Sequence, residues 1–398
     1  MKMSSHISVL LVSFLFVFLL IKKSTANSSP SYNVMDFGAA PDGRTDSTEA
    51  FLSAWSAACS SWTSATMYVP AGKFLLAKKA VFSGPCKNNA IVVKIDGTIV
   101  APSDYNVFKD NYYWILFIHV EGIMILGGVL DGQGLNLWNC KAFRRTNCPR
   151  GVTTLEISNS KDIVIMGLTS VNSQMFHTVI NGCNNVKLDN IRIMAAEDSF
   201  NTDGIHVGYS SGVQILNSMI STGDDCISIG PGTSNLFIHG ITCSPGHGIS
   251  IGSLGRHFQE AGVENVTVDS VSFFNTQNGV RIKTWGKPST SFVKSVQFQH
   301  AKMINVRYPI IIDQNYCPSN VNCPGQISGV KISDVTYTDI FGISATEVAV
   351  KLDCSKTNPC EITLQDVKLK YKNQLPKAFC ANALASTRGS VEPIIKCF

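Results

Sequence analysis

Three similar strings decide the fold, because each carries two apolar residues separated by one polar residue and ends in glycine. They are TDGIHVG (202–208), DDCISIG (224–230) and GHGISIG (246–252). The strings recur every 22 residues, and a constant interval of this size is typical of proteins built from stacked coils. The sequence therefore predicts a solenoid, in which each coil contacts mainly its two neighbours.

Asp203, Asp225 and His247 occupy equivalent places in the three strings. Equivalent positions in successive coils lie one strand spacing apart, which is roughly 5 Å. Two aspartates and a histidine are therefore expected to form one ladder on one face of the solenoid. This ladder is the first candidate for a functional site.

A second set of apolar pairs, with members two residues apart, recurs at intervals of 23 to 34 residues. The pairs are Ile163/Ile165, Val186/Leu188, Val213/Ile215, Leu236/Ile238, Val266/Val268, Val296/Phe298, Val330/Ile332 and Ile362/Leu364. Alternation of this kind directs one side chain inward and the next outward, as in a β-strand. We therefore expect an all-β protein, a right-handed parallel β-helix of at least eight coils.

Residues 46–59 have their apolar side chains at helical spacing, and Asp46 or Ser47 could cap the helix N-terminus. The apolar residues are Phe51, Ala54, Trp55, Ala58 and Cys59. An amphipathic helix that precedes a solenoid is expected to cover its open end. The stretch from Cys354 onward is expected to close the other end. No linker is evident between these ends, so residues 27–398 are predicted to form one domain.

The first 26 residues have the pattern of a secretory signal peptide. Lys2 is followed by an apolar run from Ile7 to Ile21, and residues 24–26 (STA) form a small-residue cleavage site. The alternative, a retained membrane anchor, is less favoured because a spanning helix needs about 20 residues. The mature chain is therefore expected to be secreted.

The charge balance gives no sign of a polyanionic partner such as nucleic acid. The formal net charge is +5, with 33 basic and 28 acidic residues. Removal of Lys2, Lys22 and Lys23 with the signal segment would leave 30 basic residues against 28 acidic ones. We expect no nucleic-acid partner, no membrane association after signal removal, and a monomer.

Thirteen cysteines agree with an oxidising destination. Pairing neighbours along the chain gives Cys59–Cys86, Cys140–Cys148, Cys226–Cys243, Cys317–Cys323, Cys354–Cys360 and Cys380–Cys397. This pairing leaves Cys183 as a buried thiol. The sequence alone does not fix the connectivity, so these pairs are a hypothesis.

The next coil extends the ladder with two cations. Val280 and Ile282 take the inward places, so Arg281 and Lys283 are expected to point outward together. The coil after that contributes Tyr316. Carboxylates at one end of the face and cations at the other predict a site that breaks a bond in a negatively charged substrate by acid–base chemistry.

Adjacent carboxylates suit this chemistry because they separate one another's pKa values. Two like charges 5 Å apart repel by about 3 kcal/mol at an effective dielectric constant near 20, which corresponds to roughly two pKa units. One carboxyl group then stays protonated as an acid while another stays ionised as a base. Hydrolysis of a glycosidic bond uses this pair of groups.

Each of these motifs taken alone also fits an ordinary structure. NTDG and GDD are common turn sequences, and Arg281 with Lys283 could form a solvated strand face. Their common register favours a site, because unrelated turn residues need not fall at equal offsets on one side of the solenoid.

Four motifs in this order and spacing resemble the signature motifs of polygalacturonases, the pectin-hydrolysing β-helix glycosidases. They are NTD (201–203), GDD (223–225), GHG (246–248) and RIK (281–283). The resemblance extends from about Tyr32 to the C-terminus. The strings GPGTSN (230–235) and YPIIID (308–313) are similar to those of the plant, pollen-type exopolygalacturonases.

The resemblance implies a role for each matching residue. Asp224 would be the general acid, and Asp203 and Asp225 would hold and deprotonate the attacking water, with inversion at the anomeric carbon. His247 would position the acid, and Asn201 would support the site. The groups that bind substrate would be Arg281, Lys283 and Tyr316.

The resemblance implies no metal and no other cofactor. The expected partner is polygalacturonan, the acidic polysaccharide of the plant cell wall, and the expected cleavage is exo-acting from the non-reducing end with release of galacturonic acid. Endo-acting hydrolysis, a pectate lyase, a hydrolase of rhamnogalacturonan or another decorated pectin, and a pectin-binding β-helix without activity remain alternatives.

Overall fold

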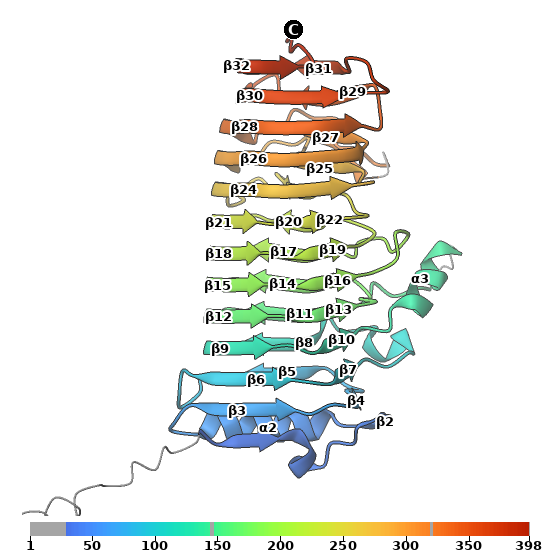
Figure 1. Ribbon diagram of the computed structural model, residues 1–398, viewed down its shortest axis with the longest axis vertical. Coiled ribbons are helices and arrows are strands. Elements are labelled where there is room, and N and C mark those ends of the chain that lie inside the picture. Colours follow the sequence, from blue (N-terminus) through green and yellow to red (C-terminus); the bar gives the residue numbers. More distant parts are fainter. Residues whose placement is uncertain (1–28, 144–146, 319–320, 398) are drawn as a thin grey trace, which may run out of the picture.

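The computed structural model describes residues 29–143, 147–318 and 321–397. Its coils, each made of strands that are consecutive in the chain, are stacked in chain order from the N-terminal to the C-terminal end (Figure 1). The strands form two parallel sheets, one of 21 strands and one of 11 strands. The predicted signal segment, residues 1–26, lies outside the described residues. The predicted parallel β-helix with an N-terminal capping helix is confirmed.

The smaller sheet contributes one strand to each coil after the first, in which helix α2 (Thr48–Ser60) follows β1 (Ser31–Asn33) and β2 (Asp42–Asp46) instead. Its strands are β5 (Ala80–Ser83), β8 (Tyr113–Ile118), β11 (Thr153–Ser158), β14 (Thr178–Asn181), β17 (Ile205–Gly208), β20 (Ile227–Ile229), β23 (Ile249–Leu254), β25 (Asn278–Trp285), β27 (Tyr308–Tyr316), β29 (Val348–Asp353) and β31 (Lys377–Ala381).

The larger sheet contributes two short strands to each early coil and one long strand to each later coil. Its strands are β1 (Ser31–Asn33), β2 (Asp42–Asp46), β3 (Ala65–Val69), β4 (Lys73–Leu75), β6 (Ile91–Ile95), β7 (Thr98–Val100), β9 (Glu121–Leu126), β10 (Val129–Asp131), β12 (Lys161–Met166), β13 (Thr169–Val171), β15 (Asn184–Asp189), β16 (Arg192–Met194), β18 (Ser211–Leu216), β19 (Met219–Ser221), β21 (Ser234–His239), β22 (Thr242–Cys243), β24 (Val263–Phe274), β26 (Phe292–Val306), β28 (Lys331–Ser344), β30 (Cys360–Lys370) and β32 (Ala383–Glu392).

The inward side chains of successive coils lie directly over one another. Ile205 pairs with Ile227, and Ile227 pairs with Ile249. The next rung pairs Ile249 with Val280, as the sequence predicts. All four side chains are fully buried. Burial of one aliphatic side chain stabilises the fold by roughly 1.5–3 kcal/mol, so these columns fix the register of the coils.

From β9 to β28, the chain turns at two corners of each coil through residues with positive φ. One corner uses Asn185, Gly212, Asn235 and Asn265, which occupy equivalent positions in successive coils. Glycine and asparagine adopt this left-handed conformation more readily than other residues. The asparagines also bond to one another, since Asn265 Nδ2 donates to Asn235 Oδ1 over 2.6 Å.

One of the predicted pairs is wrong. Val296 pairs with Val335 and Phe298 pairs with Tyr337, so Val330 and Ile332 are not the equivalent positions. Ile332 pairs instead with Val293, one step earlier in β26. The reason is a corner inside β28, where Asp334 has positive φ and interrupts the alternation. Apolar residues at spacing two lie on both sides of this corner, and the pattern alone does not distinguish them.

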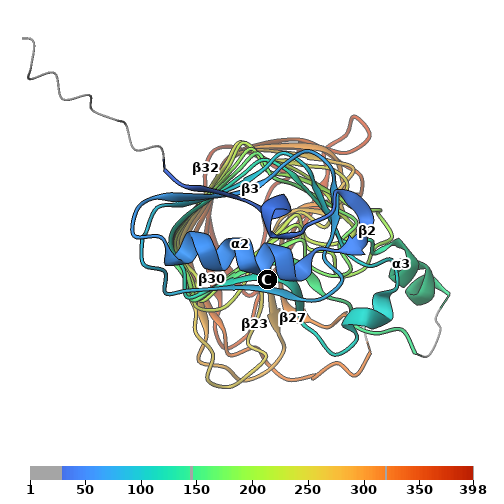
Figure 2. The same ribbon diagram turned by 90° about the horizontal axis from the view of Figure 1, so that it is seen from below.

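Helix α2 (Thr48–Ser60) crosses the opening of the first coils (Figure 2). Ser47 is the N-cap residue, and the Asp46 carboxylate accepts the Thr48 N–H over 3.0 Å. Phe51 and Trp55 are buried under the helix. The predicted capping helix is therefore present, and it covers apolar surface that the open stack would expose to water.

The remaining helical elements lie outside the coils. Helix α3 (Leu135–Ala142) projects from the side of the stack near β10 and β13 (Figure 1). Two short 3₁₀ helices are η1 (Val34–Phe37) and η2 (Tyr105–Phe108). No helix among the described residues is long and apolar enough to cross a membrane.

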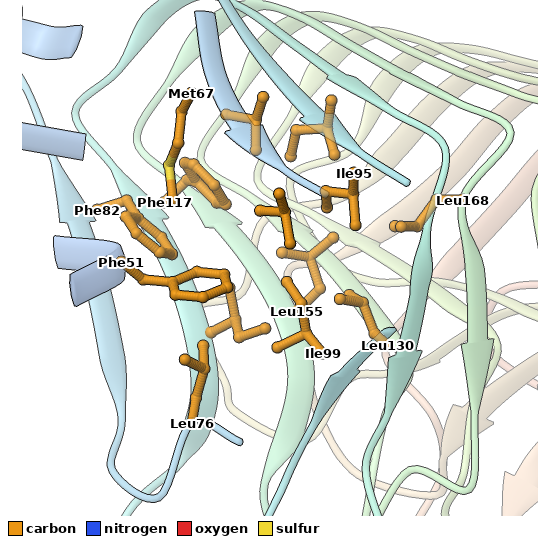
Figure 3. A pocket seen from close by; sticks show the side chains of 14 residues that line it. Phe51, Met67, Leu76, Phe82, Ile95, Ile99, Phe117, Leu130, Leu155 and Leu168 are labelled. Carbon is orange, nitrogen blue, oxygen red and sulfur yellow. The ribbon is translucent and has the colours of Figure 1, made fainter. Parts of the chain in front are cut away.

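A small cavity of about 20 Å³ lies inside the first coils, under α2 (Figure 3). Its wall is entirely aliphatic and aromatic, and Phe51, Phe82 and Phe117 form one side of it. A cavity without polar groups holds no ordered water. It is therefore a packing defect of the core and not a binding site.

All six predicted disulfides are present, and Cys183 is a free, buried thiol. The Cys226–Cys243 bridge closes a loop of 17 residues between β20 and β22. Cys226 follows Asp225 directly, so this disulfide fixes the backbone next to Asp225 to a buried residue inside the coil.

We expect replacement of Cys226 and Cys243 by alanine to lower the free energy of unfolding by about 3 kcal/mol. A disulfide that closes a loop of this length lowers the conformational entropy of the unfolded chain and so destabilises the unfolded state by about this amount. Denaturant titration of the purified double variant measures the effect. The Cys140–Cys148 double variant is the comparison, because its sequence separation of 8 predicts a loss of about 2.5 kcal/mol by the same argument; a loss below about 1 kcal/mol in the Cys226–Cys243 variant would contradict this expectation.

Candidate active site

The strand register brings the three predicted ladder residues together. Each of these residues stands two positions before an inward isoleucine that begins a strand. Asp203 precedes Ile205 of β17, Asp225 precedes Ile227 of β20, and His247 precedes Ile249 of β23. The backbone ladder continues through them, since Gly204 N donates to Asp225 O and Cys226 N donates to Gly248 O, both over 2.9 Å. The spacing of this ladder is therefore set by the coils themselves.

Two glycines allow these segments to approach closely. A Cβ atom on Gly223 would lie 2.4 Å from the carbonyl oxygen of Ser199, and one on Gly248 would lie 2.2 Å from that of Gly279. Gly248 also has a φ of 87°. Any larger residue would push the neighbouring coil away and displace the adjacent side chains.

Asp224 is held in place by four hydrogen bonds. Its Oδ1 accepts from the Asp225 N–H over 2.8 Å and shares a hydrogen bond with His247 Nδ1 over 3.0 Å. Its Oδ2 accepts from the backbone N–H and the side-chain amide of Asn201, over 3.2 and 3.3 Å. The carboxyl group is therefore fixed in orientation while its side chain keeps 17% of its surface exposed to the cleft.

Asp225 is the buried centre of an ion-pair cluster. Its Oδ1 accepts from Arg281 Nη2 over 2.6 Å and its Oδ2 accepts from Lys283 Nζ over 2.7 Å. Ser250 Oγ donates to Oδ1 over 2.8 Å. Burial alone would raise the pKa of Asp225, but the charges of Arg281 and Lys283 outweigh it and lower the pKa to about 2. Asp225 is thus an ionised group under all ordinary conditions.

Arg281 and Lys283 lie on the predicted face, but they also form ion pairs that the sequence did not predict. Arg281 aligns with Ser250 and Ser228 on the outward face, as predicted. Both cations are nevertheless engaged with Asp225 and almost buried. In the unliganded site their first role is to neutralise Asp225, and a substrate carboxylate would have to share them.

Asp203 has the opposite electrostatic environment. It is 7% exposed. Burial raises its pKa well above the ordinary value, and the charges of Asp224 and Asp225 raise it further. A proton therefore resides on Asp203 when the neighbouring carboxylates are ionised. The ladder contains both an ionised and a protonated carboxyl group, as the repulsion argument predicts.

These groups open into a hollow of about 390 Å³ on the outer face of the smaller sheet. Trp285 and Tyr316 form an edge-to-face pair with ring centroids 5.6 Å apart at its C-terminal side. Lys283 Nζ lies 5.3 Å from the centre of the Tyr316 ring. Phe176 lines the N-terminal side. The hollow thus combines carboxylates with aromatic faces on which a sugar ring can pack.

Besides the aromatic residues Phe176 and Trp285, the hollow contains two basic side chains that were not predicted from the sequence, His206 and Arg256. His206 aligns with Ser228 on the outward ladder, so the register contained the signal for it. Its Nδ1 lies 2.7 Å from Ser228 Oγ, and burial, followed by the Lys283 charge, lowers its pKa to about 4. Arg256 lies in the loop after β23, where the repeat pattern gives no position.

Asp224, Asp225 and His247 each present a possible metal ligand, and these atoms lie within 4.8 Å of one another. Both oxygens of Asp225 already bind cationic side chains. A divalent cation would compete with these two positive charges. The chemistry of the cluster therefore favours acid–base work by the side chains themselves.

The sequence signature described as "Glycosyl hydrolases family 28" matches residues 59–388. A polygalacturonase from Prunus persica is 59% identical over 393 residues, which cover 98% of this chain and 99% of that protein. An exopolygalacturonase from Platanus acerifolia is 39% identical and covers 94% of this chain and 100% of that protein.

The fold also matches solved structures. The endo-xylogalacturonan hydrolase from Aspergillus tubingensis superimposes with a TM-score of 0.81 over 91% of this chain and 99% of that one. The two sequences are 24% identical. At this identity the likeness concerns the fold.

We expect Asp225→Asn to lower the free energy of unfolding by about 3–5 kcal/mol, because it leaves two nearly buried cations without a counter-charge. Thermal and denaturant unfolding at neutral pH measure the loss. Glu121→Gln is the matched control, since it removes the exposed ion pair with Lys161 and should cost less than about 1 kcal/mol. Equal losses in the two variants would show that the buried ion pairs of Asp225 stabilise the fold no more than an exposed ion pair does.

We expect Asp203→Asn to raise the melting temperature, and to raise it more at pH 7 than at pH 4. The raised pKa of Asp203 means that the unfolded chain releases this proton at lower pH than the folded chain does. Wild-type stability therefore falls as pH rises from the unfolded pKa through the folded pKa, and asparagine removes this loss. A difference from wild type that is the same at both pH values would contradict the raised pKa.

Proposed function

The chain belongs to family 28 of the glycosyl hydrolases, and we propose that it is a polygalacturonase that hydrolyses the α-1,4-galacturonosyl bonds of pectin. The observation that carries the proposal is the pairing of a cleft-exposed carboxyl group, Asp224, with the permanently ionised Asp225. The 59% identity to the Prunus persica polygalacturonase over nearly the full length supports the substrate class.

Asp224 is proposed as the general acid that protonates the glycosidic oxygen. Its Oδ1 contacts His247 Nδ1 and its Oδ2 contacts Asn201, so both neighbours orient it toward the cleft. General acid catalysis requires this fixed orientation, because the proton must transfer over hydrogen-bonding distance. His247 and Asn201 are positioning residues in this scheme.

Asp203 and Asp225 are proposed to hold the water that attacks the anomeric carbon. Asp225 is ionised and can accept a hydrogen bond from that water. When Asp224 carries the catalytic proton, its charge no longer raises the pKa of Asp203, and Asp203 is then better able to act as base. Attack from the side opposite the acid gives inversion of configuration.

Substrate binding is assigned to Arg281, Lys283 and Tyr316. A guanidinium and an ammonium group suit a uronate carboxylate. The Lys283 ammonium lies between Asp225 Oδ2 and the Tyr316 ring, so it can contact the substrate and Asp225 together.

The mode of cleavage is proposed to be exo-acting from the non-reducing end, with release of galacturonic acid. The 39% identity to the Platanus acerifolia exopolygalacturonase supports this mode. We also propose that the protein is secreted into the plant cell wall. The plant origin of its relatives and the signal-peptide pattern of residues 1–26 support this location. Endo-acting cleavage is the second candidate. The Prunus persica relative, which is more similar to this chain, is named a polygalacturonase and not an exopolygalacturonase.

The secreted protein incubated with demethylated polygalacturonic acid tests the proposal. Galacturonic acid alone from the first minutes supports exo-acting hydrolysis, and a ladder of oligomers supports endo-acting hydrolysis. Unsaturated uronides, or no product, would overturn the hydrolase assignment. Proton NMR of the first product reports whether the anomeric configuration is inverted.

We expect Asp224→Asn to lower kcat at least hundredfold while oligogalacturonate binding changes little, since general acid catalysis typically contributes 10²–10⁴-fold. Steady-state kinetics and calorimetric binding measure the two effects. Asp198→Asn is the control, because it removes an exposed acid from the loop before Asn201. Wild-type turnover in Asp224→Asn would remove this residue from the mechanism.

A further inference from the structure

An acceptor pattern for N-linked glycosylation lies in β24, and the candidate active site does not use it. Asn265, Val266 and Thr267 form the pattern Asn-x-Thr, in which the asparagine amide of a secreted protein can receive a sugar. A second pattern, at residues 27–29, begins outside the described residues. The surroundings of Asn265 decide whether a sugar can be attached and held there.

Asn265 lies on the outside of the stack, at a corner of its coil. Its side chain is exposed and its φ is 53°, whereas the next residue, Val266, is fully buried. Strand β24 belongs to the larger sheet, and Asn265 does not line the hollow that contains Asp224. A sugar on Asn265 can therefore extend into solvent without filling that hollow.

The amide group of Asn265 can carry a sugar and keep its hydrogen bond to the preceding coil. Its Nδ2 donates to Asn235 Oδ1 over 2.6 Å, and an unmodified amide has two N–H groups. Attachment forms a bond between Nδ2 and the anomeric carbon of N-acetylglucosamine. One proton leaves the nitrogen, and the diphosphate of the lipid-linked sugar donor leaves with the electron pair of the bond that breaks. One N–H group remains for Asn235.

An exposed aromatic ring lies on that preceding coil. Phe237 in β21 pairs with Thr267 in the neighbouring strand β24, so it lies diagonally across from Asn265 (Figure 1). Diagonal neighbours on adjacent strands are roughly 7–8 Å apart, which is within reach of a large group. The ring is 39% exposed. The first sugar on Asn265 can therefore reach it.

Phe237 interrupts a column of polar side chains. The equivalent outward positions of the neighbouring coils hold Lys187, Gln214, Thr267, Gln297 and Thr336. A single exposed apolar residue is common on protein surfaces. This one is distinguished by its place, because it lies beside the acceptor asparagine.

The orientation of the Phe237 ring is fixed by its neighbours in the larger sheet. The ring stacks on that of His239, with centroids 5.8 Å apart and planes inclined by 14°. His239 Nδ1 in turn shares a hydrogen bond with Asp269 Oδ2 over 2.8 Å. Because His239 covers the face that is directed along the strand, the other face is directed back toward Asn235 and Asn265. An apolar ring face of this kind is a surface on which the C–H groups of a sugar can pack.

We propose that Asn265 carries an N-linked glycan and that its first N-acetylglucosamine packs on the exposed face of Phe237. The inference goes beyond the proposed hydrolase function and rests on the proposed secretion of the chain. Its consequence is a link on the outside of the stack between β21 and β24. These strands belong to the coils that contain Asp225 and His247, so the glycan stabilises the step between two coils of the candidate active site.

Attachment is tested on the full chain secreted by plant cells. A peptide N-glycosidase acting in water enriched in heavy oxygen converts a glycosylated asparagine into labelled aspartate, which peptide mass spectrometry assigns to one residue. We expect the label at Asn265 in the wild-type chain and in Thr267→Ser, whose hydroxyl group still completes the pattern, and no label in Thr267→Ala. A secreted wild-type chain without label at Asn265 would overturn the proposal.

Packing on Phe237 is tested by the melting temperatures of glycosylated and unglycosylated chains of identical sequence. Asn27→Gln removes the other acceptor, and tunicamycin, which blocks formation of the lipid-linked donor, supplies the unglycosylated chain. We expect the glycan to raise the melting temperature by about 2 °C. Trimming the glycan to its first sugar should preserve this rise, because only that sugar contacts the ring.

The variant Phe237→Thr places the polar residue of the neighbouring coils at this position, and the glycan should then raise the melting temperature by less than half as much. Phe341→Thr is the matched control, since Phe341 is a phenylalanine with 40% exposure in β28, two coils beyond Asn265. This control should keep the full rise. An equal rise in Phe237→Thr and Phe341→Thr would overturn the packing of the sugar on Phe237.

The outcomes also distinguish this inference from the proposed function. Hydrolysis of polygalacturonic acid by a secreted chain that has no sugar on Asn265 would overturn the glycan site alone. A labelled Asn265 in a chain that hydrolyses no polygalacturonic acid would support the site and overturn the enzymatic assignment.

Discussion

The parallel backbone ladder between coils is the constraint on which the rest of the molecule depends. Because each coil hydrogen-bonds to the next in register, equivalent residues are held about one strand spacing apart. The inward aliphatic columns maintain this register, since a shift by one residue would move them to solvent. The ladder of candidate residues has the same spacing, so the packing of Ile205, Ile227 and Ile249 determines the distances between Asp203, Asp225 and His247.

The candidate site balances its charges within the protein before any substrate is present. Arg281 and Lys283 keep Asp225 ionised, whereas burial and the adjacent carboxylates favour a proton on Asp203. Asp224 lines the same cleft and keeps 17% of its side-chain surface exposed. Asp203 and Asp225 therefore differ in protonation because of their neighbours, although their sequence context is nearly the same.

The sequence predicted the coils and the alignment of Asp203, Asp225 and His247 because both follow a repeat. Positions such as Arg281 could be placed on the outward face by counting from the inward residues on either side. The partner of Arg281 could not be predicted, because its contact with Asp225 joins residues 56 positions apart through side-chain orientation. Arg256 lies in a turn of variable length, where the repeat has no register, and the corner at Asp334 displaced the predicted Val330 pair for the same reason.

Helix α2 covers one end of the stack, and the Cys354–Cys360 and Cys380–Cys397 disulfides lie in the last coils at the other end. A stack of this kind can change its length during evolution by gaining or losing whole coils between these two ends. Each added coil would lengthen the outer face by one rung of roughly 5 Å. The number of sugar units that the groove accommodates would then change in discrete steps, without alteration of the catalytic coils.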